Sequence, residues 1–177
     1  MEAELQSKLA AIADRDEIHQ VMLRYARGLD RLDNELARSC YWDDAIEDHG
    51  HFVGSPDAFI PWADGTTLMF LSTQHAILNH VCDLQGDQAF CETYYQFTGI
   101  AAEGPHLGSV GRYVDHFQKR GGEWRIANRV TIVEGTYDLP RSSAPDPLTA
   151  YSDDQPCQAA RDRTDVSYHR PPVPRRP

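Results

Sequence analysis

The sequence contains no long hydrophobic run and no excess of positive charge. No stretch approaches the roughly 18 apolar residues of a membrane helix, and residues 1–20 lack the basic start and apolar run of a secretory signal. The formal net charge of -10 would repel a nucleic-acid duplex, and no basic amphipathic stretch suggests a membrane surface. We therefore expect a cytoplasmic protein whose partners are neither nucleic acid nor membrane.

Several functional signatures are also missing. There is no GxGxxG, P-loop, GxSxG or HExxH motif, and the four cysteines form neither a CxxC pair nor a zinc-binding spacing. His49 and His51, next to Asp48, could be mistaken for a metal site. A histidine pair in a loop is more often solvated, so we expect no metal and no cofactor.

The composition is that of one globular domain. Hydrophobic residues make up 41% of the 177 residues and charged residues 25%, both ordinary values. The character changes after Leu139, where prolines recur and RPPVPRRP closes the sequence. We predict a domain over 1–139 and a Pro-rich extension over 140–177, partly disordered or packed on a neighbour.

Three helices are predicted in the first part of the chain, over about 14–31, 33–40 and 55–65. The first begins at a capping residue, Asp14, and the other two begin at an aspartate and at a Ser-Pro pair. Apolar residues at helical spacing give the first helix one inward face: Ile18, Val21, Met22, Tyr25, Ala26 and Leu29.

Four strand-like runs follow, over about 75–84, 89–101, 107–119 and 123–135. Turn signals separate them: Gly86-Asp87, Glu103-Gly104-Pro105 and Gly121-Gly122. Helices followed by an antiparallel meander are an α+β pattern. We expect one curled antiparallel sheet whose concave face is covered by the helices.

Strictly counted hairpins predict two cross-strand neighbours. Cys82 should oppose Cys91, either as a cross-strand disulfide or, as a reducing compartment favours, as two buried free thiols. Arg129 should oppose Val114 in the last hairpin. An arginine there is either outward and solvated or inward and paired, and only an inward one would bind a substrate anion or carbonyl.

An aspartate and a histidine are the candidate catalytic pair. Asp30 stands where the first helix should end, and the negative end of the helix dipole disfavours a carboxylate there, so it needs a partner. His75 opens the first long strand and would become a general base beside a buried carboxylate. Tyr25, five residues before Asp30, can converge on the same cavity mouth.

Blocks in this order resemble the SnoaL-like branch of the nuclear-transport-factor-2-like superfamily. They are LRYARGLDRLD, YWDDAIEDHGHFVG, QHAILNHVCDLQGDQAFCETY and GEWRIANR, within about residues 10–135. The resemblance implies a cone-shaped sheet. In scytalone dehydratase, hexachlorocyclohexane dehydrochlorinase and bile-acid dehydratases, which are similar in pattern, the catalytic positions correspond to Asp30 and His75, with Tyr25 matching a tyrosine of some members.

The same resemblance implies substrate contacts. Arg129 matches an arginine of the dehydrochlorinase, and Glu47 falls near the place of its pocket tryptophan. The resemblance puts residues around Tyr95 and Phe97 in the pocket with the histidine, which the counted register allows only if a β-bulge intervenes. From the supply of aromatic residues we also assign Phe70 to the substrate pocket.

Two functions are compatible with these residues. The first is a cofactor-free lyase or isomerase, dehydratase-like, that uses Asp30 and His75 to remove a proton from a hydrophobic small molecule. The alternative is a non-catalytic ligand-binding or assembly module resembling the small subunit of ring-hydroxylating dioxygenases. A homodimer or homotrimer is expected, because outward residues such as Val110, Val114 and Ile132 need cover.

Overall fold

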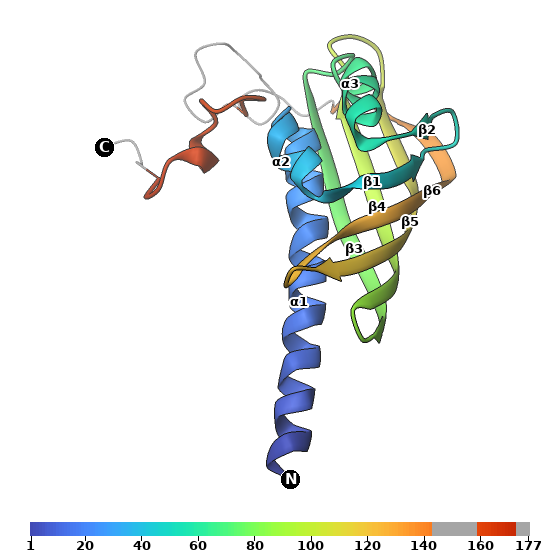
Figure 1. Cartoon of the computed structure of the whole chain (residues 1–177). Coiled ribbons are helices and arrows are strands. Elements are labelled where there is room, and N and C mark those ends of the chain that lie inside the picture. The colour runs from blue at the N-terminus through green and yellow to red at the C-terminus, as the bar shows by residue number, and fades with distance from the viewer. Residues whose placement is uncertain (143–158, 173–177) are drawn as a thin grey trace.

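A computed structural model describes residues 1–142 and 159–172. Three helices pack on a six-stranded sheet in an α+β arrangement, as expected (Figure 1). The elements are α1 (Glu2–Asp30), α2 (Asn34–Ser39), β1 (Tyr41–Asp48), β2 (Val53–Gly54), α3 (Pro56–Thr67), β3 (Ser72–Gln85), β4 (Gln88–Ile100), β5 (His106–Arg120), β6 (Glu123–Leu139) and a short 3-10 helix, η1 (Val166–Tyr168). Within the described residues, no helix combines the length and apolar character needed to cross a bilayer.

The sheet is mixed, which corrects the expectation of a purely antiparallel one. Its strand order is β2-β1-β6-β5-β4-β3, and β1 runs parallel to β6 while every other pair is antiparallel. The sequence prediction missed β1 and β2, because YWDDAIED carries so many carboxylates that it resembles a polar loop. The four-strand meander β3 to β6 is confirmed, and the cone shape stays a prediction.

The first helix is longer than predicted, and Asp14 does not cap it. Asp14 lies inside α1, where its Oδ1 accepts hydrogen bonds from Lys119 Nζ (2.7 Å) and Trp124 Nε1 (2.8 Å). The aspartate therefore ties α1 to the β5–β6 hairpin. The turns of α1 before it project beyond the sheet (Figure 1).

The two short helices begin where the sequence predicts. Asp33 caps α2, because its Oδ1 accepts the Leu36 N–H at 3.2 Å. Pro56 occupies the first turn of α3, which ends at Thr67, slightly later than expected. Helix α1 packs along β3 and β6, and α3 covers β1 and β2 (Figure 1).

The predicted β-bulge is present in β3. The pairing Cys82↔Cys91 is the one that strict counting gives, but the register shifts between Ile77 and His80. Beyond the shift His75 is the direct partner of Phe97. The extra residue turns His75 to the face that carries Tyr95 and Phe97, because side chains alternate between faces along a strand.

A second shift makes one register prediction wrong. Between His116 and Phe117 the pairing of β5 with β6 slips by one residue, so Arg129 opposes Asp115, not Val114. A one-residue slip changes every neighbour beyond it. This shift is what places a carboxylate beside the arginine.

The core lies between α1, α3 and the inner face of the sheet. Its fully buried side chains include Ile18, Met22, Tyr25, Tyr41, Phe59, Tyr113, Phe117, Trp124 and Ile126. Cys40, Cys82 and Cys91 are free thiols, while Cys157 lies outside the described residues. Within the predicted extension, 143–158 and 173–177 also lie outside them.

Candidate active site

Asp30 and His75 form a doubly hydrogen-bonded pair where α1 meets β3. Asp30 Oδ1 lies 2.7 Å from His75 Nδ1, and Asp30 Oδ2 accepts the backbone N–H of His75 at 2.8 Å. Both side chains are largely buried, with 11% and 9% exposure. The carboxylate favours a proton on Nδ1, so Nε2 is left as the ring nitrogen available for chemistry.

His75 lies at the wall of a cavity of about 250 Å³. The apolar part of the lining comes mainly from α3, β4, β5 and β6: Leu29, Phe59, Trp62, Ala63, Phe97, Leu107 and Val133. Polar groups are interspersed: His49, His51, Thr66, Thr67, Tyr95, Ser109, Tyr113 and Thr136. This volume is just below that of typical ligand pockets, which measure about 300–1,000 Å³, so it suits a compact ligand.

Three other predicted site residues lie at different depths. Tyr95 lines the cavity and stacks on Tyr113 at 4.6 Å between ring centroids, and burial raises the pKa of its hydroxyl. Phe70 is outside the lining and packs edge-on against Phe97 at 5.8 Å. Tyr25 is also outside it and is fully buried. Its hydroxyl makes no well-formed hydrogen bond to any described residue, and its catalytic role stays a prediction.

Arg129 points inward and is already paired. Its Nε and Nη2 contact Asp115 Oδ1 and Oδ2 at 2.6 and 2.9 Å, and neither side chain is exposed. The rings of Tyr25 and Tyr113 lie 4.2 and 4.3 Å from the guanidinium carbon. Burial would lower the pKa of Arg129, but Asp115 raises it well above its ordinary value.

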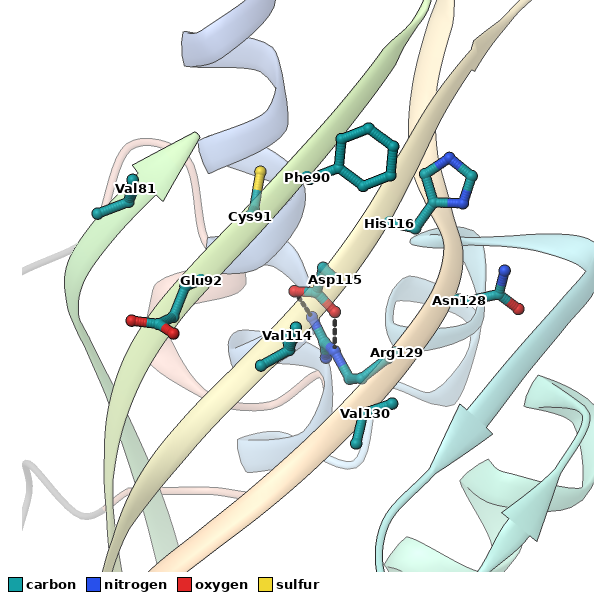
Figure 2. Close-up of a pocket in the computed structure, with 10 residues that line it drawn as sticks. All are labelled: Val81, Phe90, Cys91, Glu92, Val114, Asp115, His116, Asn128, Arg129 and Val130. Atoms are coloured by element: carbon teal, nitrogen blue, oxygen red, sulfur yellow. Dashed lines mark hydrogen bonds and ion pairs between the residues drawn. The ribbon is translucent and has the colours of Figure 1, made fainter. Parts of the chain in front are cut away.

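The arginine pair is therefore buried in the core, and a substrate-binding role for Arg129 stays a prediction. Figure 2 shows it at a separate hollow over β3 to β6, among outward residues such as Phe90 and Val130. Arg129 does not line the cavity that contains His75. A guanidinium held by both carboxylate oxygens has little left for a substrate anion.

A second carboxylate–histidine pair faces the cavity. His49 Nδ1 lies 2.9 Å from Glu47 Oε1, and Glu47 is fully buried. The hydroxyl of Tyr41 donates to Glu47 Oε2 at 2.7 Å and that of Thr131 to Oε1 at 3.3 Å. The expectation that His49 and His51 are both solvated is wrong for His49, although His51 is exposed. No local signal marked the pair, because His49 lies in the turn after β1, where Gly50 has a positive φ of 73°.

Another set of side chains could hold a metal ion away from the cavity. Ligand atoms of His80, Cys82 and Cys91 lie within 4.8 Å of one another. Burial and, to a smaller extent, the neighbouring Cys82 raise the pKa of the Cys91 thiol. This thiol would have to lose its proton to bind a metal. His80 Nδ1 is already 2.8 Å from Thr93 Oγ1. None of the three lines the cavity of His75.

The segment 159–172 holds the chain around Asp30 in place. Arg161 donates to the carbonyl oxygens of Thr67 at 2.7 Å and Phe70 at 3.1 Å, and it lies 3.3 Å from Thr73 Oγ1. The sequence offered no local signal for this contact, because Arg161 is far from α3 and β3 along the chain. Arg161 thereby ties the end of α3 to the start of the strand that carries His75.

The helices on a mostly antiparallel sheet, with a carboxylate–histidine pair at an apolar cavity, define a protein of the nuclear-transport-factor-2-like class. A family model described as the SnoaL-like domain matches residues 10–130. The chain belongs to this SnoaL-like family. No curated protein matches its sequence.

Solved structures share the fold at low sequence identity. A structure of LinA is 20% identical, with a TM-score of 0.72, over 80% of this chain and 99% of that chain. Hexachlorocyclohexane dehydrochlorinase LinA-type3 from Novosphingobium barchaimii is 17% identical, with a TM-score of 0.70, over 79% and 99%. A proposed scytalone dehydratase from Novosphingobium aromaticivorans is 21% identical, with a TM-score of 0.67, over 76% and 97%. At these identities the likeness concerns the fold.

Proposed function

We propose that this protein is a cofactor-free lyase or isomerase that removes a proton from carbon in a compact hydrophobic molecule. The observation that carries the proposal is the Asp30–His75 pair, with His75 at the wall of an aromatic cavity. A neutral histidine with one nitrogen fixed by a carboxylate is a ready general base, because the carboxylate stabilises the imidazolium that forms. Structural neighbours that are named as a dehydratase or a dehydrochlorinase have the same fold.

The roles follow from the contacts. Asp30 orients the ring and balances its charge, and His75 takes the proton through Nε2. The surrounding rings hold the substrate by apolar contact. General-base catalysis contributes about 10²–10⁴-fold, and positioning in the cavity supplies the rest.

The test is turnover of a panel of ring-shaped β-hydroxy ketones and hexachlorocyclohexane, followed by product analysis. With a substrate in hand, His75→Gln should lower kcat by on the order of 10²–10⁴-fold. Asp30→Asn should also lower it strongly, because an amide can donate to Nδ1 and reverse the tautomer. His116→Gln is the matched control, since His116 bonds Gln88 and does not line the cavity.

Full activity in His75→Gln would disprove this mechanism. Ring-shaped ligands that bind tightly without any turnover would instead support the ligand-binding or assembly module. A melting curve for each variant separates loss of chemistry from loss of fold.

A further inference from the structure

We propose that His49, held by Glu47, is the proton donor of the cavity, and that the substrate carries an oxygen atom which receives that proton. This inference rests on the proposed function and adds to it a second catalytic residue and a class of substrate. Glu47 acts through His49 and is a positioning residue, since its carboxylate is fully buried behind the ring.

The buried carboxylate of Glu47 needs a positive charge nearby, and His49 is the neighbouring group that can provide one. A buried carboxylate without a counter-charge is costly. In the part of the chain that the structure describes, His49 is the basic side chain in ion-pair contact with Glu47. Arg129 Nη1 reaches the Tyr41 hydroxyl at 3.5 Å, but Asp115 already balances the arginine. The geometry therefore places His49 as the hydrogen-bond and ion-pair partner of this buried carboxylate.

The orientation of the His49 ring also suits a donor. Glu47 Oε1 holds Nδ1, so Nε2 is the nitrogen left to act in the cavity. Two rings of α3 fix the imidazole: Phe59 stacks on it at 5.2 Å between centroids and Trp62 lies at 5.5 Å. A catalytic side chain confined in this way needs little reorganisation during the reaction.

The two histidines come to the same cavity from strands near opposite edges of the sheet. His49 follows β1, close to one edge, whereas His75 belongs to β3 at the other edge. Both line the same cavity. A molecule held there can lose a proton to one histidine and receive a proton from the other.

The other titratable groups of the cavity do not compete for these roles near neutral pH. Burial raises the pKa of the Tyr95 and Tyr113 hydroxyls, so both are much weaker acids than an imidazolium and neither supplies a phenolate base. His51 also lines the cavity, but its side chain is exposed and bonds no carboxylate among the described residues. The two carboxylates, Asp30 and Glu47, each bond the Nδ1 atom of a histidine and do not line the cavity themselves. The surroundings thus distinguish His49 from His51.

The proposed step is a dehydration. His75 takes a proton from carbon, the C–H electron pair becomes the new C=C bond, and the C–O bond breaks. The departing hydroxyl takes the proton of His49 and leaves as water, after which solvent returns His75 and His49 to their starting states. Hydroxide is a poor leaving group unless it is protonated, whereas chloride leaves as an anion. A proton donor therefore favours a β-hydroxy carbonyl compound over a chlorinated ring.

One experiment tests the donor without any substrate. The probe is 4-nitrophenol, a compact ring whose ionised form is coloured and resembles an enolate oxygen. Wild-type protein should bind the phenolate in preference to the phenol, and His49→Gln should weaken phenolate binding at least tenfold. His116→Gln, whose ring bonds Gln88 outside the cavity, is the control and should change it less than twofold. Absence of binding, preference for the neutral phenol, or equal binding by His49→Gln would each overturn the proposal.

A second measurement reads the ring directly. In nitrogen-15 spectra, His49 Nδ1 should stay protonated throughout a pH titration while Nε2 gains and loses the proton, and Glu47→Gln should change this pattern. A neutral His49 protonated on Nε2 would overturn the assignment. Once a substrate is known, His49→Gln should remove the alkaline limb of the pH–rate profile and keep the acid limb. Phenolate binding without any turnover would defeat the proposed function but not the donor site.

Discussion

The buried Arg129–Asp115 pair allows a sharp test of whether Arg129 supports the fold or binds substrate. Both side chains have no exposure, two charged hydrogen bonds join them, and two tyrosine rings flank the guanidinium. Arg129→Met keeps much of the volume and removes the charge. Asp115 then remains buried without its cation, which for such pairs typically costs about 3–5 kcal/mol of unfolding free energy.

The double variant measures the interaction between Arg129 and Asp115 separately from the effect of losing each side chain. In Arg129→Met with Asp115→Leu neither charge remains, so the loss should be clearly smaller than the sum of the two single losses. A coupling of about 1–3 kcal/mol is expected for groups in direct contact. Urea unfolding followed by circular dichroism measures all four proteins, with the exposed pair Lys8–Glu4 as the control cycle.

Two results would refute this reasoning. One is a loss below about 1 kcal/mol for Arg129→Met, the range of an exposed ion pair. The other is additive behaviour of the two substitutions. If Arg129→Met left the fold intact and abolished ligand binding in the cavity, the substrate-binding role would be right and the structural role wrong.

Two further predictions concern pH and assembly. Burial and, to a smaller extent, the charge of His19 lower the pKa of His80 from its ordinary value of 6.5. The unfolded chain therefore binds more protons at this residue than the folded chain does. The free energy of unfolding should fall as the pH drops below that ordinary value. His80→Gln should flatten this dependence in urea titrations and His116→Gln should not; an unchanged slope in His80→Gln would contradict it. We also propose a homodimer or homotrimer that covers Val81, Phe90, Val114 and Val130, which are 64%, 46%, 39% and 46% exposed. Light scattering at micromolar concentration should show the assembly and Val114→Lys should weaken it, whereas a monomeric wild type would rule it out.

Much of the fold follows from local signals in the sequence. Gly86 and Gly121 have positive φ values of 62° and 61° at the hairpin turns, a conformation that glycine adopts without strain. Asp33 caps its helix as its position predicts. Asp30 at the end of α1 needed a partner, and the structure supplies His75. Each of these inferences depends on a residue whose type is favoured or disfavoured at one particular kind of position, such as a turn, a helix start or a helix end.

What the sequence could not predict depends on register and on distant contacts. One slip between β5 and β6 decides that Arg129 meets Asp115, and nothing in the strand residues marks where that slip occurs. The parallel pairing of β1 with β6 joins segments that are far apart in the chain. The sequence therefore predicts no contact between Glu47, in β1, and His49, in the turn that follows it.

Buried polar groups also link the Arg129–Asp115 pair to the cavity. Asp115 holds Arg129, whose Nη1 reaches the Tyr41 hydroxyl, and that hydroxyl donates to Glu47. Polar groups in such a low-dielectric setting influence one another more strongly than they would in water. Loss of Arg129 should therefore disturb Glu47 and, through it, His49, while Asp30 and His75 keep their contacts. An effect of Arg129→Met on the alkaline limb of a pH–rate profile alone would show that the arginine acts on the chemistry through the carboxylate, without touching substrate.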